Sequence, residues 1–147
     1  MRQQPSVTFY PLKQIDPDSV FLFACRLVEK ARQLDHRIHL QSTTPEQAKR
    51  LDELLWQFKS ESFLPHVNID EIQKASANNV KITLGSGVNI PANPEVLICL
   101  TDKVWDLHSE FKDIREIVAA DDTGREYGRQ RYRYYQNQGY SIETLKL

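Results

Sequence analysis

The apolar run VLICL at residues 96–100 constrains the fold more than any other feature of the sequence. An apolar run without polar alternation is typical of a strand covered on both faces, as in a parallel sheet. Parallel strands need long crossover connections, and short apolar runs do alternate in this chain with amphipathic segments of helical spacing. This alternation predicts an α/β fold with a mainly parallel sheet and helices on both faces. We expect residues 1–147 to form a single domain, because this length suffices for one buried core.

The spacing of apolar residues gives the expected order of elements. Strands are predicted at residues 7–10, 37–40, 80–84, 96–100 and 114–119, and helices at 20–34, 45–58 and 122–138. The second helix has the most specific start signal, because Thr44 and Gln47 form a capping box around Pro45. Leu34 and Phe58 are the last residues in the apolar stripes of the first two helices, and we expect both to face the core.

Charge balance and cysteine use limit the class of protein. The chain has 19 Lys+Arg and 20 Asp+Glu, and its net charge of -1 argues against coating nucleic acid by bulk charge. Cys25 and Cys99 lie in apolar runs and are expected to be buried, reduced thiols. No apolar stretch reaches the roughly 20 residues of a membrane span, and the N-terminus lacks the pattern of a secretory signal. We therefore expect a cytoplasmic protein that has no membrane partner.

The motifs that would indicate an enzyme or a cofactor all fail in detail. GSGVNI at residues 85–90 follows a strand, but Ile90 replaces the third glycine of a dinucleotide-binding turn and prolines follow. We predict a hairpin or crossover turn there, without a nucleotide-binding glycine motif. His36 and His39 would point to opposite faces of a strand, so no metal site is expected. Since no nucleophile and base form a recognisable pair, we expect neither a cofactor nor catalysis.

The last predicted helix concentrates charge and aromatic residues. Residues 125–136, REYGRQRYRYYQ, hold four arginines, one glutamate and four tyrosines. At 100° per residue, one face of this helix carries Arg125, Arg129, Tyr132 and Arg133. Guanidinium groups around an aromatic ring form a receptor for a carboxylate or phosphate beside an apolar anchor. The other tyrosines, Tyr127, Tyr134 and Tyr135, are candidates for packing on the sheet.

Three interpretations of this helix face remain open. It is a solvated basic surface, a site for an acidic peptide that ends in an aromatic residue, or a site for single-stranded nucleic acid. A nucleic-acid groove usually spreads its positive charge and its stacking residues over several elements. Here both lie in one short stripe, which favours a compact peptide terminus.

A second candidate surface lies after the second helix. Trp56 and Phe58 are two residues apart, so both cannot face the core of a helix that also buries Leu55. If Phe58 is in the core, Trp56 projects toward Phe63 and forms a candidate apolar docking patch. Alternatively, Phe63 folds back and covers Trp56 within the monomer. Residues 59–79 are otherwise polar and irregular, and are predicted to form a long loop with some local structure.

Several segments resemble one family over nearly the whole chain. They are TFY at 8–10, AKRLDELLWQFKSESFLPH at 48–66, VLICL at 96–100 and GREYGRQRYRYYQNQGY at 124–140. Together they resemble the chi subunit of bacterial DNA polymerase III. The resemblance implies a non-catalytic accessory subunit of the clamp-loader assembly, with a Rossmann-like fold and no bound nucleotide. It also implies one-to-one pairing with the psi subunit, and binding to the acidic C-terminal tail of single-stranded DNA-binding protein, which ends in phenylalanine with a free carboxylate.

The same resemblance assigns roles to individual residues. It implies that Arg129 binds the terminal carboxylate, Arg125 and Arg133 bind acidic residues, and Tyr132 and Val118 form walls around the aromatic ring. Trp56 and Phe63 fall on the surface that faces psi, for which a repair helicase is a possible competitor. This chain departs from the family in two ways: relatives carry Lys where it has Arg125 and Arg133, and Gln136 stands where a further basic residue can occur.

These inferences lead to a ranked set of functions. The first is a replication adaptor at the replisome that contacts DNA mainly indirectly and whose tail binding weakens with salt. The second is direct binding of single-stranded nucleic acid through the same helix face. An enzyme of nucleotide metabolism ranks third, because it rests on the fold alone.

Overall fold

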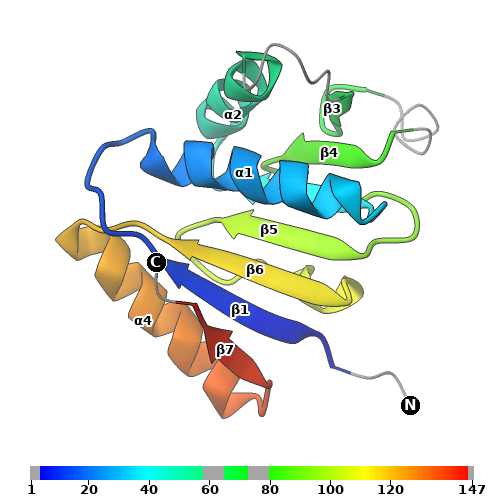
Figure 1. Cartoon of the computed structure of the whole chain (residues 1–147). Coiled ribbons are helices and arrows are strands. Elements are labelled where there is room, and N and C mark those ends of the chain that lie inside the picture. The colour runs from blue at the N-terminus through cyan, green and yellow to red at the C-terminus, as the bar shows by residue number, and fades with distance from the viewer. Residues whose placement is uncertain (1–3, 58–64, 73–79, 146–147) are drawn as a thin grey trace.

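A parallel β-sheet forms the centre of the molecule (Figure 1). The structure is a computed structural model that describes residues 4–57, 65–72 and 80–145. Its elements are β1 (Ser6–Pro11), α1 (Ser19–Gln33), β2 (Ile38–Ser42), α2 (Pro45–Gln57), β3 (His66–Asn68), β4 (Ile82–Gly85), β5 (Val96–Leu100), the 3-10 helix η1 (His108–Glu110), β6 (Asp113–Val118), α4 (Asp122–Asn137) and β7 (Ile142–Thr144). The strand order in this part of the chain is β3-β4-β2-β5-β6-β1-β7, and every paired strand is parallel to its neighbour.

The two faces of the sheet carry separate apolar clusters. Alternate residues of β5 point to opposite faces, so that Ile98 packs with α1 and α2 while Leu97 packs on the side of α4. Ala24 and Leu51 are fully buried on the first face, and Tyr135 of α4 is fully buried on the second. The predicted α/β fold with a parallel sheet, helices on both faces and a Rossmann-like arrangement is therefore confirmed (Figure 1).

Local signals place the helix ends where the sequence predicts them. The Gln47 Oε1 atom accepts hydrogen bonds from the backbone N–H groups of Thr43 and Thr44, at 3.0 and 3.2 Å, and the Gln47 N–H donates to Thr44 Oγ1 at 3.2 Å. This is the predicted capping box of α2. At the other end of the chain, Gly139 has a φ of 80° and ends α4. The N–H of the next residue, Tyr140, turns back to the carbonyl of Tyr135 at 3.0 Å.

Two strands and one core position differ from the sequence predictions. β3 lies inside the segment predicted as a loop, and β7 follows α4 without having been predicted. Each has three residues and joins an edge of the sheet through backbone hydrogen bonds, so neither needs a long apolar run. Leu34 is 65% exposed because α1 ends one residue earlier and Asp35 takes a left-handed φ of 62°. The predicted core residue Phe58 lies outside the described residues.

The two cysteines are free and buried, as predicted. Burial raises the pKa of the Cys25 thiol to about 12, so this thiol stays protonated and unreactive. None of the helices in the described segments is long and apolar enough to cross a bilayer.

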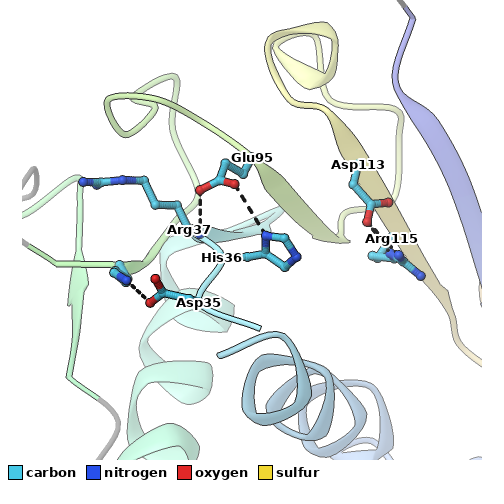
Figure 2. Close-up of polar contacts among 7 residues, drawn as sticks. Asp35, His36, Arg37, Glu95, Asp113 and Arg115 are labelled. Carbon is cyan, nitrogen blue, oxygen red and sulfur yellow. Dashed lines mark hydrogen bonds and ion pairs between the residues drawn. The ribbon is translucent and has the colours of Figure 1, made fainter. Parts of the chain in front are cut away.

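Polar contacts join the strands at their amino ends (Figure 2). The Glu95 carboxylate accepts hydrogen bonds from the backbone N–H of Arg37 at 3.1 Å and from His36 Nδ1 at 3.5 Å. The bond from the Arg37 N–H holds the pKa of Glu95 below its usual value. Lys81 pairs with Asp35 nearby, and on β6 a separate ion pair joins Arg115 to Asp113 at 2.6 Å. These groups lie at the amino ends of the strands, and the candidate site lies at their carboxyl ends.

Candidate functional site

A basic cavity opens where β1 and β6 end and α4 crosses them. Its volume is about 750 Å³, within the usual size range of small-ligand pockets. It is lined by Phe9, Pro11, Leu12, Lys13, Val118, Ala119, Arg125, Gly128, Arg129, Tyr132, Arg133, Gln136 and Thr144. The five residues expected to bind an acidic tail are among them: Val118, Arg125, Arg129, Tyr132 and Arg133. The segments that supply the lining meet here because β1 and β6 are parallel neighbours that end side by side.

The floor of the cavity is apolar and aromatic. The ring of Phe9 is buried, and its centroid lies 5.3 Å from that of Tyr132, with the two planes inclined by 59°. Tyr132 remains 36% exposed and lines the cavity, so part of its side chain is accessible to a ligand. Val118 and Leu12 continue this apolar surface from the ends of β6 and β1. The arrangement offers a slot for a flat apolar group beside charged side chains.

Cations form the rim of the cavity, and no carboxylate lines it among the described residues. Arg125, Arg133 and Lys13 are exposed and have no ion-pair partner within the segments that the structure describes. Arg129 donates from Nη1 to Glu126 Oε2 at 3.0 Å, and both side chains are at least half exposed. An exposed pair of this kind contributes little stability, so a carboxylate ligand can replace Glu126 at small cost. The rim therefore suits an anion that reaches several guanidinium groups at once.

Gly128 lets α4 approach the sheet at the cavity. A Cβ atom at this position would lie 2.6 Å from Val118 Cγ1 and 3.1 Å from Val118 Cγ2. The same holds for Gly124, one turn earlier, where an added Cβ atom would lie 2.6 Å from the Cβ of Ala119. Glycine in the middle of a helix costs stability, so Gly124 and Gly128 are a signal of close packing that is present in the sequence itself.

We expect Gly128→Ala to lower the free energy of unfolding by about 1–3 kcal/mol, because the added methyl group overlaps Val118. Denaturation in urea measures this change. The matched control is Gln130→Ala on the exposed side of α4, which should leave stability unchanged or slightly higher through helix propensity. A Gly128→Ala variant as stable as the wild type would show that the helix has room to move away.

Arg131 belongs to the basic stretch of this helix but not to the face predicted to bind a ligand. It is only 3% exposed. Its Nε donates to Glu116 Oε1 at 2.9 Å, and Nη1 and Nη2 donate to the carbonyls of Asp102 and Ile117 at 3.1 and 3.2 Å. The Tyr135 hydroxyl donates to the other oxygen of Glu116 at 2.6 Å. Arg131 thus anchors α4 to β6, and the remaining three arginines face the cavity.

The other tyrosines of α4 divide between core and surface. Tyr135 is fully buried on the sheet, as predicted for the residues outside the basic stripe. Tyr134 is 41% exposed and meets His108 edge-on at 5.7 Å, so it does not pack on the sheet. His108 Nδ1 donates a hydrogen bond to the backbone carbonyl of Trp105 at 2.5 Å, a structural contact.

The glycine turn after β4 binds a carboxylate of the protein itself. Asp70 accepts hydrogen bonds from the backbone N–H groups of Ser86 and Gly87, at 2.8 and 3.1 Å, and from Asn89 Nδ2 at 3.0 Å. A Cβ atom at Gly85 would lie 2.9 Å from Asp70 Oδ2. The amides that a phosphate group would need are therefore engaged by Asp70. The turn connects β4 to β5 on the two sides of β2, so it is a crossover and not a hairpin.

His39 belongs to a buried hydrogen-bond chain that reaches this turn. Its Nε2 lies 2.9 Å from Gln41 Oε1, a pure acceptor, so Nε2 carries the proton and Nδ1 accepts from Thr83 Oγ1 at 2.8 Å. The amide of Gln41 then donates to the carbonyl of Gly87 at 2.9 Å. Burial lowers the pKa of His39 to about 4, so its ring is neutral at pH 7. Across the described segments, no three His, Cys, Asp or Glu side chains gather as metal ligands.

Trp56 forms the exposed end of α2. Its side chain is 53% exposed, and its ring centroid lies 4.4 Å from that of His66 on β3. His66 Nε2 is 3.0 Å from Asp52 Oδ1 on the same helix as Trp56. Phe63, the second residue predicted for this surface, lies outside the described residues. Trp56 is thus exposed, as expected if Phe58 faces the core, and the docking patch itself stays a prediction.

Comparison with known proteins gives one consistent match. The family model described as "DNA polymerase III chi subunit, HolC" matches residues 5–143. The DNA polymerase III subunit chi of Pseudomonas aeruginosa is 30% identical over 141 residues, which covers 96% of each chain. The corresponding subunit of Escherichia coli is 27% identical over 82% of this chain and 80% of its own, and that of Haemophilus influenzae is 26% identical over 92% and 93%.

Proposed function

This chain belongs to the DNA polymerase III chi subunit family, and on that premise we propose that it is a non-catalytic adaptor of the clamp-loader assembly. In this proposal, it binds the acidic, phenylalanine-terminated tail of single-stranded DNA-binding protein and so links the replicase to coated lagging-strand DNA in the cytoplasm. The observation that supports it most is the cavity beside α4, where five residues expected at a tail site line one apolar slot with a cationic rim.

The cavity supplies a partner for each part of such a tail. The terminal phenyl ring enters between Tyr132 and Val118 above Phe9, where it gains apolar and edge-to-face contacts. The terminal carboxylate takes the place of Glu126 on the Arg129 guanidinium, which offers two parallel donors. Arg125 and Arg133 flank this position and attract the acidic residues that precede the phenylalanine.

Weak binding of a single tail suffices for such an adaptor. A coated DNA strand displays many tails, and a second attachment through psi raises the effective concentration further. The opposite charges of tail and cavity also speed association and make it sensitive to salt.

We propose that Trp56 is part of the psi-facing surface, together with Phe63. A large exposed aromatic side chain at the end of a helix is typical of a protein-binding surface. One psi subunit at this position would tether the chain to the clamp loader. A repair helicase that uses the same surface would compete with psi.

Titration calorimetry with an acidic, phenylalanine-terminated peptide tests the adaptor function. We expect micromolar binding that weakens between low and high salt. Arg129→Ala should weaken it about tenfold or more, because a charged hydrogen bond to the carboxylate is lost. The matched control is Arg32→Ala, an exposed arginine of α1 on the other face of the sheet.

Two outcomes would contradict the proposal. If the peptide does not bind at low salt, the cavity is not a tail site. If a peptide without its terminal phenylalanine binds as well as the intact one, the cavity responds to charge alone, and direct binding of single-stranded nucleic acid becomes the better explanation.

A further inference from the structure

A second hollow adjoins the basic cavity. Its volume is about 270 Å³, and it lies between the segment that follows β1 and the first turns of α1. Leu12 and Lys13 line both the cavity and this hollow, so the two are neighbours. Figure 1 shows the same arrangement of elements, with the start of α1 and the start of α4 both near the carboxyl end of β1.

The second hollow has the same chemical character as the cavity. Arg26 and Lys13 line it, and no carboxylate does among the described residues. Arg26 has no ion-pair or hydrogen-bond partner within the described part of the chain. Asp18 is the acidic residue closest in sequence to the hollow. Its carboxylate already forms an ion pair with Arg50 at 2.9 Å.

Apolar surface lies next to these cations. Leu22 is 38% exposed although it lies on a helix that packs on the sheet, and Phe23 lines the hollow beside it. Cations beside an apolar surface complement a peptide that contains both carboxylates and apolar groups. Its carboxylates pair with the cations, and its apolar groups pack on the apolar surface.

We propose that the bound acidic tail continues from the cavity across Lys13 into this second hollow, where Arg26 binds a carboxylate upstream of the terminal phenylalanine. This inference rests on the proposed function, since the terminal phenylalanine must occupy the cavity first. Lys13 then serves as a bridging cation between the two positions. The site therefore binds an extended acidic segment as well as the C-terminal residue of the tail.

Two synthetic peptides of different length test this extension. The short peptide holds only the last four residues, and the long peptide adds acidic residues upstream. An extended chain advances about 3.3–3.6 Å per residue, so a few added residues suffice to pass Lys13. We expect the long peptide to bind the wild-type protein about two- to fivefold more tightly, as for one exposed ion pair.

Arg26→Gln should abolish this gain and leave the affinity for the short peptide unchanged. Arg32→Gln, on the same helix but outside the hollow, is the matched control and should keep the gain. Both side chains are exposed, so neither variant should disturb folding.

The outcomes separate this inference from the function on which it rests. If neither peptide binds the wild-type protein, the proposed function fails and the extension fails with it. If both peptides bind but Arg26→Gln behaves like Arg32→Gln, the tail site stands and the extension is overturned.

Discussion

Replacing Arg131 with methionine is expected to lower the free energy of unfolding by about 3–5 kcal/mol, the largest effect of any single change considered for this protein. Glu116 is fully buried, and the guanidinium of Arg131 is its ion-pair partner at 2.9 Å. Burial raises the pKa of Glu116, while Arg131 and the hydroxyl of Tyr135 oppose this rise. Without Arg131, the carboxyl group must remain buried without a counter-ion or take up a proton, and two backbone carbonyls lose their donors. Urea denaturation followed by circular dichroism measures the loss.

Two further variants separate this effect from the loss of positive charge. Arg129→Met makes the same chemical change on the exposed side of the helix and should alter stability by no more than about 0.5 kcal/mol. The double variant Arg131→Met with Glu116→Leu removes both charges and should recover much of the stability, because a buried ion pair is often no better than an apolar pair. Equal losses for Arg131→Met and Arg129→Met would show that the buried pair does not hold α4 in place.

Lowering the pH from about 6.5 to about 4 is expected to remove about 3 kcal/mol of stability through His39 alone. The pKa of His39 is about 4 in the folded protein and about 6.5 when the chain is unfolded, because the folded ring is buried. Between these values the unfolded chain binds more protons than the folded one, so acid favours unfolding. The contribution is fully present above about pH 6.5. Thermal or urea unfolding at several pH values in this window measures it.

The variant His39→Gln isolates this term from the other titrating groups. It removes the imidazole while it keeps a polar side chain near Thr83 and Gln41. The variant should be less stable than the wild type at pH 7, but its stability should fall less steeply between pH 6.5 and 4. Parallel curves for the two proteins would mean that His39 does not titrate differently in the folded and unfolded states.

The elements that could be predicted are those with a strong apolar period. VLICL, the stripe of α1 around Ala24 and Val28, and the capping box of α2 each carry a local signal, and each lies where the sequence places it. β3 and β7 carry no such signal. They have three residues each and exist because β4 and β1 offer free backbone groups at the sheet edges, which is a property of the assembled sheet.

The sequence predicts the part of the candidate site that lies on α4, because helical spacing relates residues of one helix only. The angular spacing of Arg125, Arg129, Tyr132 and Arg133 places them on one face, and the structure brings these residues together. The same spacing does not reveal that Arg131 turns inward to a glutamate on β6. Phe9 and Lys13 join the cavity from the other end of the chain, so their part depends on the parallel pairing of β1 with β6.

The strand order also sets how far apart two simultaneous partners would be held. Trp56 lies beside β3 at one margin of the sheet, whereas the cavity draws on β1 and β7 at the other. Adjacent strands are about 4.8 Å apart, so the six steps from β3 to β7 separate these margins by roughly 29 Å. A ligand at either margin leaves the other accessible, and the hydrogen-bonded strands between them form a spacer of fixed length. If both surfaces bind partners as proposed, the sheet is a rigid connection between them, and any flexibility of the assembly lies in the partners.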